Sequence, residues 1–182
     1  MITKEMFKDM ILMQRQLDAI IMKNQRIERL NPTRVHASYI VELAETVNEM
    51  KGDFKYWSIK EPDTQKFLEE LVDATHFMLT YSYVMADKQH GSYEYEEGED
   101  RIDYRYRLLK KQMEDMKEFM DVFTHKDNFE IANEALLTKD LLASYAYLLI
   151  IAERYNINGF DLMRAYEDKY LINIERSESG TY

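Results

Sequence analysis

Cysteine is absent from the 182 residues of this sequence. Without thiols the chain cannot form disulfides, bind a metal through thiolates or use a cysteine nucleophile. Glycine and proline are scarce, at 5 and 2 copies, which is few for the many tight turns of a sheet protein. Ala, Leu, Met, Glu, Lys and Gln instead dominate many windows, and these residues favour helices. We therefore expect an all-α fold.

A long apolar run is also lacking. The longest apolar stretch, residues 141–152, is too short and too rich in tyrosine for a membrane span. The first ten residues, MITKEMFKDM, carry charges throughout and lack the apolar core of a signal peptide. These features predict a cytoplasmic protein that does not cross a membrane.

Positive charge is in deficit. The chain has 24 Lys and Arg residues against 34 Asp and Glu residues, for a net charge of -10. Such a chain repels the phosphate backbone of DNA and RNA, so we do not expect a nucleic-acid polymer as partner. A small polyphosphate remains compatible, because a divalent cation can invert the local charge.

Apolar residues recur at helical spacing along most of the chain. The expected helices cover residues 4–29, 34–50, 64–88, 101–124, 129–154 and 160–175. Thr33, after Asn31-Pro32, is the expected N-cap of the second helix. The acidic stretch 89–99 is expected to be an exposed loop and the tail SESGTY to be flexible. The length suits a single helical domain over residues 1–182.

Two acidic pairs provide the main functional signal. Glu42 and Glu45 lie three residues apart in the second expected helix, and Glu70 and Asp73 repeat this spacing in the third. The spacing places both carboxylates of a pair on one helix face. Antiparallel helices joined by a short connection can bring the pairs together. A hard divalent cation would then offset their repulsion.

Solvated acidic faces are the ordinary alternative. On a helical wheel, Glu42, Glu45 and Glu49 lie opposite the apolar stripe, which fits that alternative. That stripe consists of Ile40, Leu43, Ala44, Val47 and Met50. Glu70, however, falls inside the apolar arc of the next helix, and Asp73 lies at the edge of that arc. A partly buried carboxylate needs a partner, so a metal site or an ion pair is expected there.

A carboxylate-bridged di-iron site is a competing possibility. Such a site requires Glu-x-x-His on two helices, whereas this chain offers Asp73-Ala-Thr-His76 once. A di-iron site is therefore disfavoured. The wheel places His76 on the polar side of its helix, as a surface or supporting residue.

Four segments together resemble the dimeric dUTPase family, within the all-α nucleoside-triphosphate pyrophosphatases that include MazG-like proteins. They are IVELAETVNEMKGDFKYWS (40–58), FLEELVDATHF (67–77), AYEDKYLINIERSESGTY (165–182) and, more weakly, MQRQLDAII (13–21). The acidic pairs become fairly specific when joined to Phe-Lys-Tyr-Trp-Ser and Asp-x-x-His-Phe. Residues 85–160 add little to the resemblance.

The resemblance implies an all-α helical bundle with a central four-helix core. It also implies a Mg²⁺ site and a reaction, the hydrolysis of dUTP, and of dUDP, to dUMP. The implied metal ligands are Glu42, Glu45, Glu70 and Asp73. A carboxylate would take the proton of the attacking water, with Glu45 as first candidate and Glu49 as second. Glu49 could also support or join the metal ligands.

Further residues are implied to bind the substrate. Lys169, Asn173 and Arg176 match the family's Lys-x-x-x-Asn-x-x-Arg pattern and share one helix face, with the two cations suited to phosphates. Without the resemblance they would be an ordinary basic helix end. Gln14 matches a motif implicated in base recognition, although Asp18 stands where the family often has Asn.

The segment between the acidic helices offers two more substrate candidates. Trp57, the single tryptophan, could form a wall of the nucleotide pocket or anchor a core, and Lys55 could reach phosphates or be solvated. Both are carried as substrate-binding predictions.

Three functions stay open at this point. The first is dUTP hydrolysis, the second a dCTP or less selective pyrophosphatase, and the third a non-catalytic helical interaction protein. A homodimer is expected from the resemblance, and the helix over residues 137–152, apolar nearly all round, fits a core or an interface.

Overall fold

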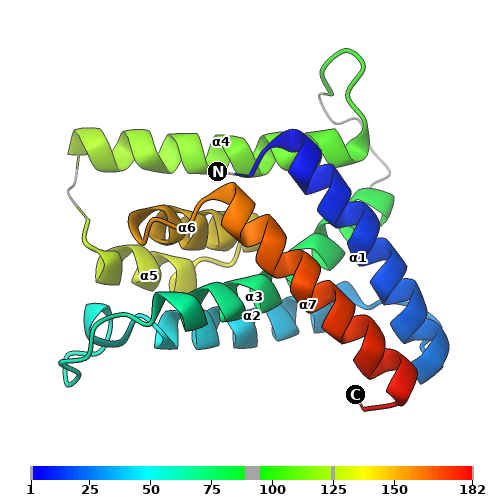
Figure 1. Cartoon of the computed structure of the whole chain (residues 1–182). Coiled ribbons are helices and arrows are strands. Elements are labelled where there is room, and N and C mark those ends of the chain that lie inside the picture. Colours follow the sequence, from blue (N-terminus) through cyan, green and yellow to red (C-terminus); the bar gives the residue numbers. More distant parts are fainter. Residues whose placement is uncertain (1, 89–94, 124–125, 182) are drawn as a thin grey trace.

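The structure is a computed structural model that describes residues 2–88, 95–123 and 126–181. The described residues form seven α-helices and no strand, which confirms the expected all-α fold (Figure 1). The helices are α1 (Lys4–Gln25), α2 (Pro32–Asn48), α3 (Thr64–Lys88), α4 (Arg101–Phe123), α5 (Asn128–Leu137), α6 (Leu141–Arg154) and α7 (Gly159–Ser179). A short 3-10 helix covers Lys51–Asp53.

Helices α2 and α3 form an antiparallel hairpin (Figure 1). Asn31, not Thr33, is the N-cap of α2: its side chain accepts a hydrogen bond from the Thr33 amide at 2.9 Å. Pro32 occupies the first turn, where its missing N–H costs nothing. Leu43 and Val47 are buried, but Ile40 of the predicted apolar stripe is 40% exposed. The hairpin therefore buries one edge of that stripe and leaves the other edge bare.

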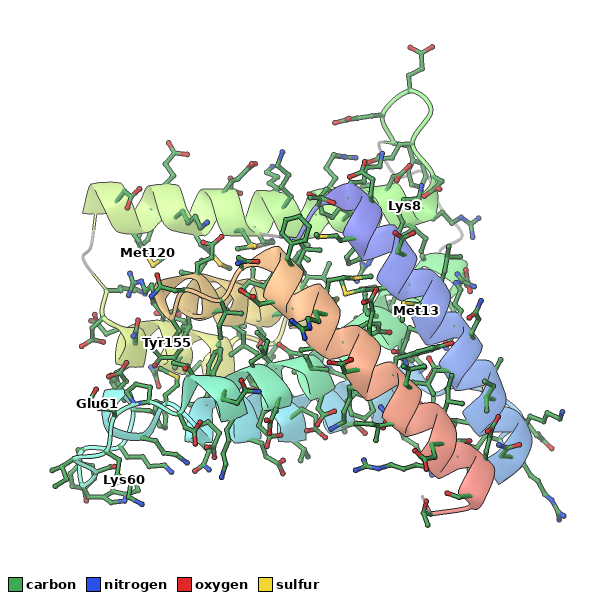
Figure 2. All side chains as sticks on the ribbon, viewed as in Figure 1. Lys8, Met13, Lys60, Glu61, Met120 and Tyr155 are labelled. Atoms are coloured by element: carbon green, nitrogen blue, oxygen red, sulfur yellow. The ribbon has the colours of Figure 1, made fainter. Side chains whose placement is uncertain are left out.

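A backbone hydrogen bond joins the two sides of the loop between α2 and α3 at its base. The amide of Gly52 donates to the carbonyl of Lys60 at 2.9 Å, and a Cβ at position 52 would lie 2.8 Å from that same oxygen. Only glycine allows this close approach. The amide of Asp63 also donates to the carbonyl of Glu49 at 3.0 Å. Figure 2 shows Lys60 and Glu61 on this loop, which projects beyond the ends of α2 and α3.

Helices α1 and α7 lie side by side and both contact α3 (Figure 1). The Tyr166 hydroxyl of α7 donates its proton to the Gln14 oxygen of α1 at 2.9 Å and lies 3.2 Å from the carbonyl oxygen of Met10 in the same helix. Farther along, the Asn24 side chain of α1 donates to the carbonyl of Ser177 at 3.0 Å. These bonds tie the beginning and the end of the chain together across one face of α3.

Helix α6 forms the centre of the core. Its residues from Leu141 to Ala152 are buried apart from Tyr147, against α3, α4 and α5. The apolar helix expected at 137–152 is thus accounted for within one chain. The single helix expected over 129–154 was wrong, because Thr138 is extended and the Asp140 side chain caps a new helix by accepting from the Ala143 amide at 2.9 Å.

Two other helix ends differ from expectation. Helix α1 stops at Gln25, where Arg26 takes a left-handed conformation with φ 56°. Helix α7 continues to Ser179, and Gly180 caps it with φ 72°. Arg176 is therefore helical, and most of the tail expected to be flexible is ordered. Of the loop expected at 89–99, residues 89–94 lie outside the described residues.

None of the described helices combines the length and the apolar character that a membrane span requires.

Candidate active site

Three carboxylates converge on the α2–α3 hairpin. Glu42 and Glu45 extend from α2 and Glu70 from α3, and one oxygen of each lies within 4.8 Å of the others. Glu45 is exposed, whereas Glu42 and Glu70 are half-buried. The burial of Glu70 follows from its position within the apolar arc of α3, as the wheel predicted. The structure thus brings together three of the four predicted metal ligands.

Burial and mutual repulsion raise the pKa values of two carboxylates in this cluster, Glu42 and Glu70. Burial, followed by the charges of Asp73, Glu45 and Glu70, raises the pKa of Glu42 to about 7. Burial, followed by Asp73 and Glu45, also raises the pKa of Glu70. Like charges held this close disfavour ionisation. The cluster therefore lacks positive charge, and a cation bound to it would lower both pKa values.

The fourth predicted ligand, Asp73, is bound differently. One of its oxygens lies 2.6 Å from the Lys169 ammonium of α7. Asp73 still acts on the cluster, since its charge is the largest electrostatic contribution to the raised pKa values of Glu42 and Glu70. Lys169 opposes both shifts. Asp73 thus stands between the acidic cluster and a cation.

Glu49 corrects the helical-wheel prediction of a solvated residue. It is only 8% exposed, because α2 ends there and the chain turns inward. Its carboxylate lies 2.6 Å from the Lys51 ammonium and accepts from the side-chain amide of Asn48 at 3.1 Å. Its charge contributes to the raised pKa of Glu70, so it lies beside the cluster with its own counter-ion.

A pocket of about 410 Å³ opens next to the cluster. Helices α1, α2, α3 and α7 all contribute to its walls. Six of its lining residues were predicted from the sequence: Gln14, Glu42, Asp73, Lys169, Asn173 and Arg176. Acidic side chains from α2 and α3 thus face two cations from α7. The remaining walls are mainly apolar, including Leu17, Ile21 and Phe77.

The end of the pocket near α1 is a network of buried polar groups. Asp18 accepts hydrogen bonds from Gln14 at 3.0 Å, Thr80 at 2.7 Å and Tyr83 at 2.7 Å. Burial raises the pKa of Asp18, and these three donors oppose that rise. The Gln14 oxygen accepts from the Tyr166 hydroxyl at 2.9 Å. The amide expected to read a base is thus already held by protein groups.

His76 is the residue that the sequence prediction missed. It is 6% exposed and lines the pocket, with Nδ1 2.7 Å from the Gln14 oxygen and its ring 4.5 Å from that of Tyr166. The wheel placed it on the polar side of α3, which was wrong because α1 and α7 cover that side. The signal in the sequence was the polar Gln14 and Asp18 among the apolar residues of α1.

Trp57 and Lys55 do not line this pocket. Trp57 is 71% exposed and stands edge-on to Tyr56, with ring centroids 4.9 Å apart. Lys55 lies in the same loop, with its amide bonded to the carbonyl of Lys51 at 2.7 Å. Within a single chain, the structure does not bring these two predicted residues to the other candidates.

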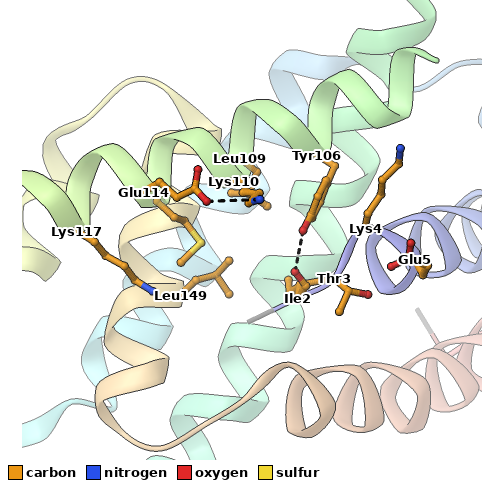
Figure 3. A pocket seen from close by; sticks show the side chains of 11 residues that line it. Ile2, Thr3, Lys4, Glu5, Tyr106, Leu109, Lys110, Glu114, Lys117 and Leu149 are labelled. Carbon is orange, nitrogen blue, oxygen red and sulfur yellow. Dashed lines mark hydrogen bonds and ion pairs between the residues drawn. The ribbon is translucent and has the colours of Figure 1, made fainter. Parts of the chain in front are cut away.

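A second cavity, of about 650 Å³, lies between the start of α1, α4 and α6 (Figure 3). Its floor is apolar, with Leu109, Met113 and Leu149, and the Tyr106 hydroxyl at its edge donates to the carbonyl of Ile2 at 3.2 Å. Larger volume does not make it the active site, because Glu42 of the carboxylate cluster, Asp73 and the α7 cations line the other pocket.

An acidic cluster that faces two cations across a pocket defines a class: enzymes that act on phosphate groups with help from a cation. A family model described as dUTPase matches residues 6–181, so the chain belongs to the dimeric dUTPase family and is a dUTP diphosphatase. The family match supports the enzymatic interpretation over the non-catalytic alternative. A search among curated proteins finds no match.

Proposed function

We propose that the chain hydrolyses dUTP, and also dUDP, to dUMP in a Mg²⁺-dependent reaction at the pocket between α1, α2, α3 and α7. The observation that carries the proposal is that Glu42, Asp73, Lys169 and Arg176 line one cavity, and that Glu45 and Glu70 cluster with Glu42 at its side. A nucleoside polyphosphate needs both features, since its phosphates bind cations of the protein and a cation held by carboxylates.

The donor set suits Mg²⁺. The ion prefers oxygen ligands and is held by one or two carboxylates together with substrate phosphates. The raised pKa of Glu42, about 7, reveals uncompensated negative charge that such an ion would neutralise. Glu42, Glu45 and Glu70 would hold the ion, and Asp73 would join them once the substrate phosphates draw Lys169 away. The bound ion would neutralise phosphate charge and lower the pKa of a water molecule.

The residues of α7 would orient the phosphates. Lys169 lies about one helical turn before Asn173 and Arg176 about one turn after it, and all three line the pocket. Cations fixed there offset the negative charge that moves to the leaving phosphates as the reaction proceeds. Asn173 would bind next to the nucleoside, and Gln14 at the opposite end would bind the base.

A carboxylate would act as the general base. The water oxygen attacks phosphorus, the bond between phosphorus and the bridging oxygen breaks, and pyrophosphate leaves, or phosphate when dUDP is the substrate. The proton of the water passes to the carboxylate. Glu45 is the first candidate because it is the most exposed of the cluster. Glu49 is the second, since its ion pair with Lys51 already occupies one oxygen.

The loop and the oligomer complete the proposal. Trp57 and Lys55 would reach a bound nucleotide through movement of their loop or from a second copy of the chain. A homodimer is supported by Ile40 and Val41 on α2, which are apolar and exposed. Light scattering on the purified protein tests it, with twice the 21.9 kDa chain mass as the expected result. The cytoplasmic location stays a prediction of the sequence.

A direct assay tests the reaction. Purified protein with dUTP and Mg²⁺ should release dUMP and pyrophosphate, and chelation of the metal should stop the release. A panel of dUTP, dUDP, dCTP and dTTP distinguishes the proposal from a less selective pyrophosphatase, because equal turnover of dCTP would contradict the preference for uracil. No dUMP from folded protein would refute the proposed function.

A further inference from the structure

The orientation of the Gln14 amide is fixed by its neighbours. Its nitrogen donates to an Asp18 oxygen at 3.0 Å. A carboxylate only accepts hydrogen bonds, so the amide nitrogen must face Asp18 and the amide oxygen must face the other way. That oxygen accepts from the Tyr166 hydroxyl at 2.9 Å and lies 2.7 Å from Nδ1 of His76.

This orientation fixes the tautomer of His76. Because the Gln14 oxygen can only accept, Nδ1 must carry the proton and Nε2 must present a lone pair. Burial, followed by the positive charge of Lys169, lowers the pKa of His76 to about 3, so the ring stays neutral at physiological pH. The chain Asp18–Gln14–His76 thus sets the hydrogen-bonding character of one imidazole nitrogen.

The Nε2 atom is left without a partner. It is buried, and no hydrogen-bond donor reaches it among the residues that the structure describes. Buried acceptors are nearly always paired in folded proteins, so an unpaired one next to a pocket points to a ligand. His76 lines the pocket between Gln14 and Asp73, with Phe77 beside it. Since Nε2 is shielded from water, a ligand must part the adjacent walls to reach it.

We propose that His76 Nε2 accepts a hydrogen bond from the ring N3–H of the uracil base. The inference rests on the proposed function and deepens it. One N–H of Gln14 is bound to Asp18, and its oxygen already has two partners. The Gln14 oxygen therefore cannot accept from N3–H, whereas Nε2, on the other side of the imidazole ring from Nδ1, offers a lone pair.

His76→Phe tests the proposal. The change keeps an aromatic ring against Tyr166 and removes the acceptor. The KM for dUTP should rise roughly 10- to 100-fold while kcat changes little, since a contact made equally in the ground and transition states affects KM alone. His76→Gln, whose amide can donate to Gln14 and still offer an oxygen to the base, should recover much of the loss.

A base-free probe separates recognition from structure. Deoxyribose 5′-triphosphate without a base, used as a competitive inhibitor with Mg²⁺, should bind His76→Phe and the unmodified protein with the same inhibition constant. Ser144→Ala serves as matched control: it removes a buried hydroxyl that accepts from Tyr39 at 3.0 Å, away from the pocket. This control should lower the melting temperature without raising the KM for dUTP.

Two results would overturn the inference. An unchanged KM for dUTP in His76→Phe would show that Nε2 makes no contact with the base. An equal loss of affinity for dUTP and for the base-free triphosphate would show that His76 supports the pocket structurally. If the unmodified protein turns over no dUTP, the proposed function itself fails, which is a separate result from either of these.

Discussion

The two ends of the pocket handle charge in opposite ways. At the α2–α3 end, Glu42 and Glu70 repel each other and their neighbours, and their pKa values are raised. At the α1 end, the buried Asp18 receives three hydrogen bonds from neutral groups. The α2–α3 end holds like charges close together, whereas at the α1 end neutral donors oppose the rise in the pKa of Asp18 that burial causes.

The two ends of the pocket suit two different functions, cation binding and recognition of a neutral base. A site that binds a cation must hold negative charge in reserve, at the expense of stability in the metal-free state. A site that reads a neutral base needs groups with fixed direction, and a saturated network provides them. Mutations at the two ends should therefore affect activity and stability in different proportions.

Glu70→Gln should have the largest effect. Removing a charge from the cluster should lower kcat/KM for dUTP on the order of 1,000-fold, about 4 kcal/mol of transition-state stabilisation. The melting temperature without metal should rise slightly, because repulsion is relieved. The neighbouring Glu69→Gln is the control, since Glu69 is exposed and bonds only to Gln65 at 3.2 Å among the described residues. Equal losses in both variants would argue against the cluster as metal site.

Lys169→Met should come next. The change removes a cation from the pocket and leaves Asp73 without its partner at 2.6 Å. We expect kcat/KM to fall roughly 100-fold, as for loss of a group that stabilises transition-state charge. Lys66→Met, at an exposed position on α3, should retain full activity. Steady-state kinetics at saturating Mg²⁺ provide the measurement, and full activity of Lys169→Met would exclude a role in phosphate binding.

Asp18→Asn, at the α1 end of the pocket, should lower stability more than the substitutions at the α2–α3 end do. An amide nitrogen would face donors that now point to a carboxylate oxygen, so about 1–3 kcal/mol of unfolding free energy should be lost. Urea denaturation monitored by circular dichroism measures it. Asp115→Asn, exposed on α4, is the matched control and should be neutral. Unchanged stability of Asp18→Asn would contradict the saturated hydrogen-bond network around Asp18.

The free energy of unfolding should depend on pH because the pKa of Glu42 is raised in the folded chain. The pKa of Glu42 is about 7 in the folded chain against an ordinary 4.5. Between these values the folded state holds more protons, so stability is greatest below pH 4.5 with respect to this group and falls as pH rises to about 7. After allowance for solvent screening we expect about 1 kcal/mol, or roughly 2–4 °C in melting temperature.

Two comparisons isolate this contribution. Saturating Mg²⁺ should remove most of the fall, because the bound cation favours the ionised form. Glu42→Gln should show a shallower decline than the unmodified protein across the same pH interval. A decline of the same slope in both proteins would assign the effect to other groups.

Trp57→Ala should have the smallest effect on stability. With 71% of the side chain exposed, the unfolding free energy should change by no more than about 0.5 kcal/mol. The proposed contact with the nucleotide predicts that the KM for dUTP rises severalfold. Calorimetry and steady-state kinetics measure the two quantities, and an unchanged KM would remove Trp57 from the substrate site.

The sequence predicted those features that depend on one helix or on one hairpin. The spacing of Glu42, Glu45 and Glu70 requires only two neighbouring helices. The half-burial of Glu70 follows from its place in the arc of α3. The helix break before Asp140 was missed although its signal, a capping residue after Thr138, was visible in the sequence.

The burial of His76 and Glu49 could not be predicted, because it depends on packing between distant segments. His76 appears solvated on the wheel of α3 because the wheel contains no information about α1 and α7, which cover it. The burial of Glu49 depends on the turn at Lys51, which has a left-handed φ of 50° in a residue other than glycine. Neither fact can be read from periodicity, since both arise from contacts made after the helices have formed.

The loop closed by Gly52 contains a natural fluorescent probe, Trp57. Trp57 is the single tryptophan of the chain, so indole fluorescence excited at its red edge originates from this loop alone. Because the backbone hydrogen bond from Gly52 to Lys60 holds the base of the loop, changes in emission would report the environment of its tip. Titration with a slowly hydrolysed nucleotide analogue could then follow loop docking in real time, without any added dye.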